Sequence, residues 1–175
     1  MQKLTLTLIG LFLLALTSRG GTPVKGLLER IDAGASRKFA IEYVKSDTDF
    51  FELDQKGKKV VVRGNNSISI ATGIHWYLKY HAGIHLTWNN MQAELPDVLP
   101  AVTKKERHET PLKHRYYLNY CTHSYSMAFW DWERWEKEID WMAMHGINMP
   151  LSITGMEVVW YNLLKRIGYT TEEIN

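Results

Sequence analysis

The chain has 175 residues, of which 45% are hydrophobic, 23% charged and 12% aromatic, and its formal net charge is +2. This composition excludes a disordered or fibrous protein and suits a globular chain of one domain or two small ones. The near-neutral charge does not favour a protein that binds nucleic acid or an anionic membrane surface.

Residues 1–20 are predicted to be a cleaved secretory signal. Lys3 supplies a positive start, the run from Leu4 to Leu16 is nearly all apolar, and short polar residues follow. The run is too short for an ordinary membrane span; a buried core element is the alternative, but the flanking residues favour a signal. We therefore expect a secreted or periplasmic protein with no stable membrane insertion after cleavage. With Cys121 as its only cysteine, the chain can form no internal disulfide.

Residues 22–102 are predicted to form a small N-terminal α/β domain. Thr22-Pro23 can begin a helix in which Leu27, Leu28 and Ile31 share one face. Strands are expected at 38–44, 50–53, 59–63 and 84–88, with a hairpin turn at 54–57 and a second helix at 67–81. This order is that of an α+β layer domain.

A linker is expected at 89–105, where two prolines and several charges interrupt the pattern. The part from 107 to 175 then alternates, with strands expected at 116–122 and 147–154, helices at 131–145 and 156–167, and a capping box at 170–173. Two β/α units with short connections are typical of a parallel sheet or of the start of a TIM-like (β/α)8 barrel. Because a closed barrel needs eight units, we expect this second domain to be truncated.

One long motif carries a resemblance to a known family. It runs from Arg115-Tyr116-Tyr117 through Asn119, Cys121-Thr122 and Trp130-Asp131-Trp132 to Gly146-Ile147-Asn148. These rare residues stand in the register of the α-N-acetylglucosaminidases of glycoside hydrolase family 89, which the chain resembles. The likeness continues more weakly through Ser152, Gly155, Glu157 and Trp160.

The resemblance implies a secreted retaining exo-glycosidase that releases terminal α-linked N-acetylglucosamine from glycans. Such cleavage uses two glutamates about 5 Å apart, and in the family both lie on later barrel strands. The resemblance therefore assigns no catalytic residue to this chain, whose partner would be a glycan and which needs no cofactor. The alternatives are a non-catalytic carbohydrate-binding or interaction fragment and, less favoured by the motif, a glycosidase of other specificity. Further coding sequence after Asn175 would separate the first two functions.

Asn119 and Cys121 are the first candidates for sugar-binding residues. On the predicted strand they share a face with Tyr117, and Cys121 falls at the carboxyl end, where barrel enzymes build their sites. A nucleophilic Cys121 activated by His123 is an alternative, but nothing in the sequence orients the imidazole. A packed cysteine in the core is the other alternative. We interpret both residues as lining the pocket, in agreement with what the resemblance implies.

Glu157 is the third candidate. It lies in the first turn of a predicted helix, after the second strand, where a carboxylate can contact sugar or simply stabilise the helix N-terminus. Met156 stands where the family usually has glutamine, which puts any contact by that amide in doubt.

The helix at 131–145 has an expected core stripe of Trp132, Trp135, Ile139, Met142 and Ala143. Trp141 lies outside this stripe and is expected to pack against another element. The seven histidines show no metal-ligand spacing, because Gly83 interrupts the helix between His81 and His85. Asn65-Asn66-Ser67 is either a glycosylation sequon or a helix cap.

Overall fold

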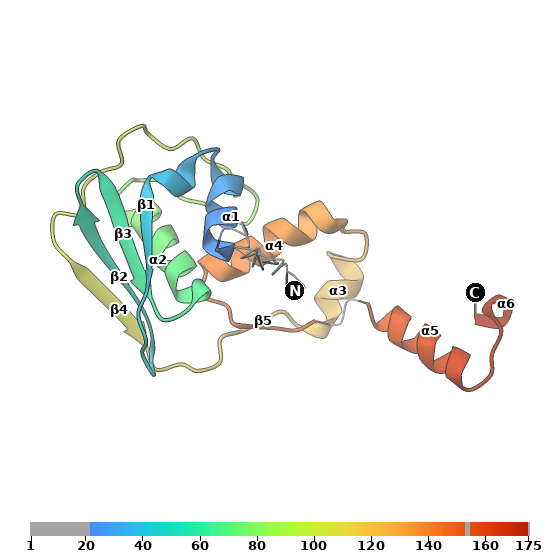
Figure 1. The fold of residues 1–175 in the computed structure, drawn as a ribbon. Helices are drawn as coiled ribbons and strands as arrows, with labels where there is room; N and C mark the ends of the chain where they lie inside the picture. Colours follow the sequence, from blue (N-terminus) through green and yellow to red (C-terminus); the bar gives the residue numbers. More distant parts are fainter. Residues whose placement is uncertain (1–21, 153–154, 175) are drawn as a thin grey trace, which may run out of the picture.

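The computed structural model describes residues 22–152 and 155–174, and the expected signal at 1–20 lies outside these ranges. Within them, the longest and most apolar helices still fall short of what a membrane crossing requires. The chain is a mixed α/β protein with a small sheet in its first half (Figure 1).

The sheet has four strands, β1 (Phe39–Tyr43), β2 (Asp49–Lys56), β3 (Lys59–Gly64) and β4 (Glu106–Thr110). Their order in the sheet is β1-β3-β2-β4; β1 runs parallel to β3, and the other pairs are antiparallel. The helices α1 (Pro23–Ile31) and α2 (Ser67–Tyr80) lie beside it, with the short helix η1 (Ala35–Arg37) between α1 and β1 (Figure 1). The core is therefore a helix-on-sheet layer.

Local chemistry explains these elements. Pro23 starts α1, and the side chain of Asn66 accepts a hydrogen bond from the backbone N–H of Ser69 at 2.8 Å, which caps α2. Leu28, Leu53, Val60, Val62, Ile70, Ile74 and Leu78 are fully buried between the helices and the sheet. At Gly73 a Cβ would lie 2.9 Å from the Cβ of Phe51, so α2 can approach β2 this closely only because it has glycine there.

The expectation of a strand at 84–88 is wrong. That segment is irregular apart from one bridge between Thr87 and Asn90, although Leu86 is buried. The last strand of the sheet is β4, which pairs with β2 from Asp49 opposite Thr110 to Leu53 opposite Glu106. Its sequence, ERHET, is polar, so hydrophobic periodicity did not predict it. The boundary at 102–107 between two domains stays a prediction.

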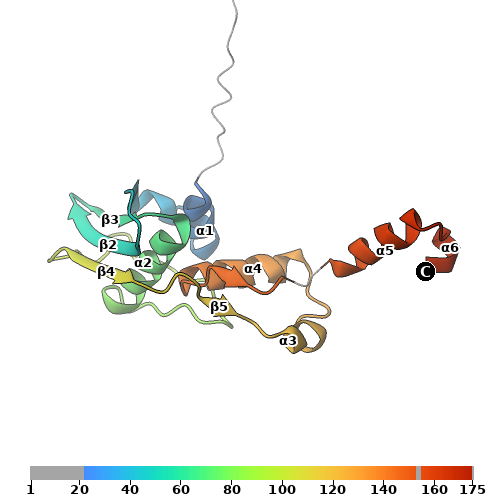
Figure 2. The same ribbon diagram turned by 90° about the horizontal axis from the view of Figure 1, so that it is seen from below.

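The second half contains β5 (Tyr116–Tyr117), α3 (Tyr120–Tyr125), α4 (Trp132–Met144), β6 (Met149–Pro150), α5 (Met156–Arg166) and α6 (Thr171–Ile174). β5 and β6 pair in parallel. The helix α4 lies against α2, whereas α5 and α6 extend away from the rest of the molecule (Figures 1 and 2). The pair β5–β6 agrees with a parallel β-α-β unit, and its place in a larger barrel stays a prediction.

The expected strand at 116–122 is wrong beyond Tyr117. Leu118 adopts a left-handed backbone conformation with φ of 87°, and the chain enters α3 instead of continuing extended. The predicted helices at 131–145 and 156–167 are confirmed as α4 and α5. The capping box is also confirmed, because Thr170 and Glu173 exchange hydrogen bonds between side chains and backbone N–H groups.

The expected core stripe of α4 is confirmed at Met142 and Ala143 and is wrong at Trp132 and Ile139. Trp132 is 69% exposed and Ile139 46% exposed, whereas Glu138, Asp140, Met142 and Met144 are buried. α4 turns the side that bears Met144 toward α2, and Trp132 and Ile139 of its apolar stripe are left exposed. Trp141 does pack as expected, with its ring centroid 5.3 Å from that of Tyr117.

Candidate functional site

The three predicted sugar-binding residues follow the carboxyl ends of two paired parallel strands. Asn119 and Cys121 come after β5, and Glu157 comes after β6, with residues 153–154 outside the described ranges. Because parallel strands end at the same edge of a sheet, the structure places all three residues beyond one edge. It does not bring their side chains into contact through any hydrogen bond among the described residues.

Asn119 is the cap of α3. Its Oδ1 accepts hydrogen bonds from the backbone N–H of Thr122 at 3.1 Å and from the Thr122 hydroxyl at 3.0 Å. The pattern of asparagine followed three residues later by threonine is a capping signal that the strand interpretation overlooked. The residue is exposed, and within the described ranges no hydrogen bond engages its Nδ2, which can donate to a hydroxyl group.

Cys121 lies in the first turn of α3 as an exposed free thiol. It does not share a strand face with Tyr117 and Asn119, because the strand ends before either of them. His123 is two residues further along the same helix, and residues at this spacing do not face each other. Its ring instead lies 6.4 Å from that of Trp135. The geometry therefore gives no support to an activated nucleophile.

Glu157 lies in the first turn of α5 and is exposed. The helix begins after Gly155, whose φ is 84° and which has no capping side chain. An acidic residue at this position stabilises the helix N-terminus through its dipole. This structural role is sufficient to explain its position, and a role in sugar binding stays a prediction.

A cavity of about 350 Å³ opens beside the strand ends. Its walls are mostly apolar side chains from α4, from β6 and from the loops beside these elements: Leu118, Met127, Trp132, Trp135, Ile139, Met142, Pro150 and Leu151. The buried Glu138 is its charged member. One oxygen of that carboxylate accepts from the indole N–H of Trp88 at 2.7 Å and from Arg134 at 3.1 Å.

The carboxylates of α4 are already engaged. Glu133 pairs with Lys137, and Glu138 pairs with Arg134. Glu136 and Asp140 both pair with Arg30 of α1, and the contact with Asp140 is bidentate at 2.6 and 2.7 Å. Groups that neutralise neighbouring cations are poorly placed to act as acid and base on a substrate. The structure therefore assigns the carboxylates of α4 to packing and positioning.

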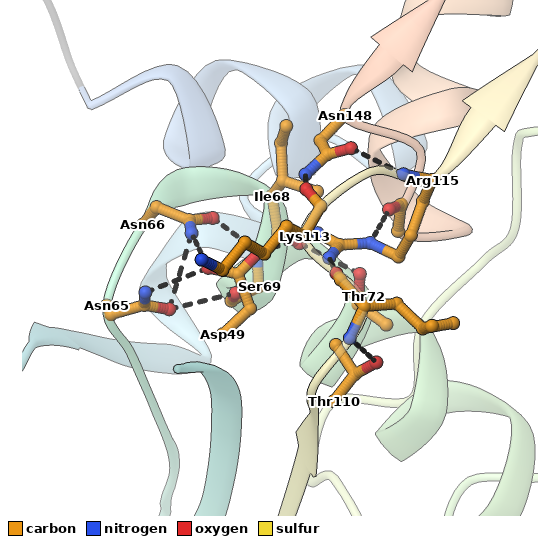
Figure 3. Close-up of polar contacts among 12 residues, drawn as sticks. Asp49, Asn65, Asn66, Ile68, Ser69, Thr72, Thr110, Lys113, Arg115 and Asn148 are labelled. Carbon is orange, nitrogen blue, oxygen red and sulfur yellow. Dashed lines mark hydrogen bonds and ion pairs between the residues drawn. The ribbon is translucent and has the colours of Figure 1, made fainter. Parts of the chain in front are cut away.

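A polar junction fixes the start of β5 against the small sheet (Figure 3). Arg115 donates to a carboxylate oxygen of Asp49 at 2.7 Å, to the carbonyl oxygen of Leu112 at 2.7 Å and to that of Gly146. Its own backbone N–H donates to Asn148 at 2.8 Å, so one residue links β2, β5 and the segment before β6. The sequence motif contained Arg115 and Asn148, but their partner Asp49 lies 66 residues upstream and carried no signal.

The charge at this junction is stable. Burial raises the pKa of Asp49, but the hydrogen bonds from Asn65, Arg115 and Asn66 outweigh burial, and the net pKa is lowered. Asp49 thus remains ionised and continues to hold Arg115. Since β5 begins at the next residue, this junction positions the edge that bears Asn119 and Cys121.

Two family models match the chain in tandem. The model of the α-N-acetylglucosaminidase N-terminal domain matches residues 22–101, and that of the α-N-acetylglucosaminidase TIM-barrel domain matches residues 115–175. Human α-N-acetylglucosaminidase is 39% identical over 165 residues, which cover 90% of this chain and 22% of the human protein.

Solved structures agree with the family models. A family 89 glycoside hydrolase from Clostridium perfringens, with two glutamates replaced by glutamine and in complex with its substrate GlcNAc-α-1,4-galactose, matches with a TM-score of 0.79 and 37% identity. The same enzyme family from that organism in complex with PUGNAc matches with a TM-score of 0.78 and 38% identity. Each match covers 86% of this chain and 18% of the solved chain. The chain thus spans about a fifth of the length of these relatives.

Proposed function

Because the chain belongs to the α-N-acetylglucosaminidase family, we propose that it carries the N-terminal part of a retaining exo-glycosidase that releases terminal α-linked N-acetylglucosamine from glycans. The observation that carries this proposal is the tandem match of both family models, in the order that the fold follows. The relative bound to GlcNAc-α-1,4-galactose supports the substrate class.

In this proposal the chain binds and positions the sugar but does not cleave it. Retention requires a nucleophile and an acid/base about 5 Å apart on opposite sides of the bond. The carboxylates of α4 are held in ion pairs, and Glu157 alone cannot supply two roles. The catalytic pair is then contributed by other strands of a (β/α)8 barrel in which β5 and β6 are the first two.

The proposed contribution of this chain is one wall of the sugar pocket. Asn119 keeps its oxygen on Thr122 and presents its amide N–H groups to a hydroxyl of the sugar. Cys121 lies two residues further on, in the first turn of α3, and lines the same wall, while Glu157 supports the neighbouring strand end. Asn119 and Cys121 are polar without a charge, which suits an uncharged sugar.

Secretion completes the proposal. The run from Leu4 to Leu16 would direct export and be removed, leaving a mature chain that begins near Gly20. Sequencing the N-terminus of exported protein tests this, and finding Met1 or Gln2 on exported material would refute cleavage.

Activity assays test the function itself. The 175-residue chain should not hydrolyse an aryl α-N-acetylglucosaminide above background, while a longer polypeptide that begins with this sequence should do so with retention. In that longer enzyme, Asn119→Ala should reduce kcat/KM by the equivalent of about 1–3 kcal/mol, the cost of an unmatched polar contact. Turnover by the short chain would show that the chemistry is assigned to the wrong residues.

A further inference from the structure

A second cavity, away from the strand ends, lies between the small layer and the first half of α4. It has a volume of about 540 Å³, within the usual range for a small-molecule site. The end of α1, the irregular segment 88–92 and the outer side of α4 form its walls. A shallower hollow of about 580 Å³ shares Glu29, Arg30, Ile31, Asn90 and Gln92 with it and extends it along the end of α1. Together they form an elongated cleft.

A fixed indole stands in this cleft. Trp88 is 42% exposed, and its N–H donates to the buried carboxylate of Glu138 at 2.7 Å. The guanidinium carbon of Arg134 lies 4.7 Å from the centre of the Trp88 ring and 3.9 Å from that of Trp130. These contacts hold the ring in one orientation. A ligand that stacks on it therefore does not have to order the side chain, and this lowers the entropy cost of binding.

Most of the charges around the indole are paired with one another. Arg30 pairs with Asp140 and Glu136, and Lys137 pairs with Glu133 at 2.8 Å. Glu29 accepts hydrogen bonds from the backbone N–H groups of Gly34 and Ser36. Among the charged residues of the cleft walls, carboxylates outnumber cations: Glu29, Asp32, Glu94, Glu133, Glu136 and Asp140 against Arg30, Arg134 and Lys137. The cleft therefore disfavours an anionic ligand.

Amide groups supply the remaining polar contacts. Asn89 and Gln92 are exposed on the wall beside Trp88, and within the described part of the chain neither side chain forms a hydrogen bond. Side-chain amides both donate and accept, which matches the hydroxyl and acetamido groups of a sugar. An aromatic surface, walls that disfavour anions and free amides together suit an uncharged, hydroxyl-rich ligand.

A row of aromatic rings connects the wall of the cleft with α3. Ring centroids of Trp88 and Trp130 are 6.2 Å apart, those of Trp130 and Trp135 are 5.1 Å apart, and Trp135 in turn lies 6.4 Å from His123 of α3. This row of rings leads from the cleft to the helix that bears Cys121.

We propose that this cleft is an accessory binding site for a neutral oligosaccharide, in which Trp88 stacks on a sugar ring and Asn89 and Gln92 bind its polar groups. The ligand class follows from the cleft walls. The choice of a terminal N-acetylglucosamine probe rests on the function proposed above.

The test is a titration of the 175-residue chain with GlcNAc-α-1,4-galactose, followed by NMR at the indole N–H of Trp88. That resonance is identified by its loss in Trp88→Phe. We expect it to shift with a Kd of roughly 1 mM, and the double variant Asn89→Ala/Gln92→Ala should weaken binding about 5–10-fold through the loss of one or two hydrogen bonds. An exposed amide far away, changed in Asn162→Ala, serves as the matched control and should leave the Kd unchanged.

Each alternative outcome overturns the proposal. If the disaccharide shifts only resonances of α3, and Asn119→Ala abolishes that binding, the sugar binds at the strand ends and the cleft is not a site, while the proposed function stands. Absence of any shift at Trp88, or binding unaffected by the double variant, has the same consequence for the cleft. Tighter binding of a sulfated oligosaccharide than of the neutral probe would show that the ligand class is wrong.

Discussion

Three histidine rings meet where α2 contacts α4. His75 is 8% exposed, and its ring centroid lies 4.4 Å from that of His145 and 6.0 Å from that of His85. Burial first, and then the neighbouring His145, lower the pKa of His75 from 6.5 to about 4. Electrostatic repulsion from His85 and Lys79 also lowers the pKa of His75. The folded chain therefore binds this proton less readily than the unfolded chain does.

This shift predicts a loss of stability in acid. Below pH 6.5 the unfolded chain takes up a proton at His75 that the folded chain does not bind until the pH approaches 4. The folded state therefore loses stability as the pH falls from 6.5 to 4, and it keeps its full stability above 6.5. The loss should be on the order of 2–3 kcal/mol, and His75→Gln should flatten the dependence. Urea unfolding at several pH values measures it. The exposed His114, changed to Gln, is the control, and an equally steep profile in His75→Gln would contradict the assignment.

Cys121 provides a second prediction for a single residue. Because its thiol is exposed and free, iodoacetamide should label the folded chain completely, as judged by mass spectrometry against an unfolded sample. In the longer active enzyme, Cys121→Ser should retain substantial activity, since a residue that only lines a pocket takes no part in the bond chemistry. Protection of the thiol in the folded chain, or complete loss of activity in a well-folded variant, would contradict this placement.

Single residues also show where sequence reasoning succeeds. The burial of Leu27, Leu28 and Ile31 followed from helical spacing, because each pattern is local. The role of Asn119 did not follow from its sequence context, since the same residues suit both a strand face and a helix cap. Only the turn at Leu118 decides between them, and leucine carries no preference for a left-handed backbone.

At the scale of elements, Arg115 is the link between the small sheet and the β5–β6 pair. Its side chain is 16% exposed and that of Asp49 is 23% exposed. Arg115→Ala should reduce the free energy of unfolding by about 2–3 kcal/mol, because one oxygen of the Asp49 carboxylate and two carbonyl groups lose their donor. Urea denaturation measures this. The exposed Arg166 of α5, changed to Ala, should alter stability by less than about 0.5 kcal/mol.

Elements with strong hydrophobic periodicity were predicted well, and polar ones were not. The hairpin β2–β3 and the helices α1, α2, α4 and α5 follow from local patterns. β4 does not, because its pairing with β2 depends on a partner more than 50 residues away in the chain. The segment 84–88 has the composition of a strand but pairs with neither edge of the sheet, and it packs Leu86 into the core instead.

At the scale of the whole molecule, the apolar side of α4 is open. Trp132 and Ile139 are exposed beside the cavity at the strand ends, and contiguous apolar surface of this kind promotes association. We expect the chain to bind an apolar dye and to self-associate as its concentration rises. Trp132→Ser combined with Ile139→Ser should reduce both effects with little loss of stability. Val98→Ser, at a residue 69% exposed on the small layer, is the control in dye fluorescence and sedimentation.

The place of β4 has a consequence for biosynthesis. The sheet is complete only when β4, which ends at Thr110, has paired with β2. A nascent chain that has reached residue 102 therefore still has an unpaired β2 edge. Once Thr110 has left the ribosome, β4 can complete the sheet. The helix α2 then offers a folded surface against which α4 can pack when it is synthesised. The small layer would thus act as a template for the half of the chain that is made after it. A pause in translation between these two points would expose the β2 edge to other chains.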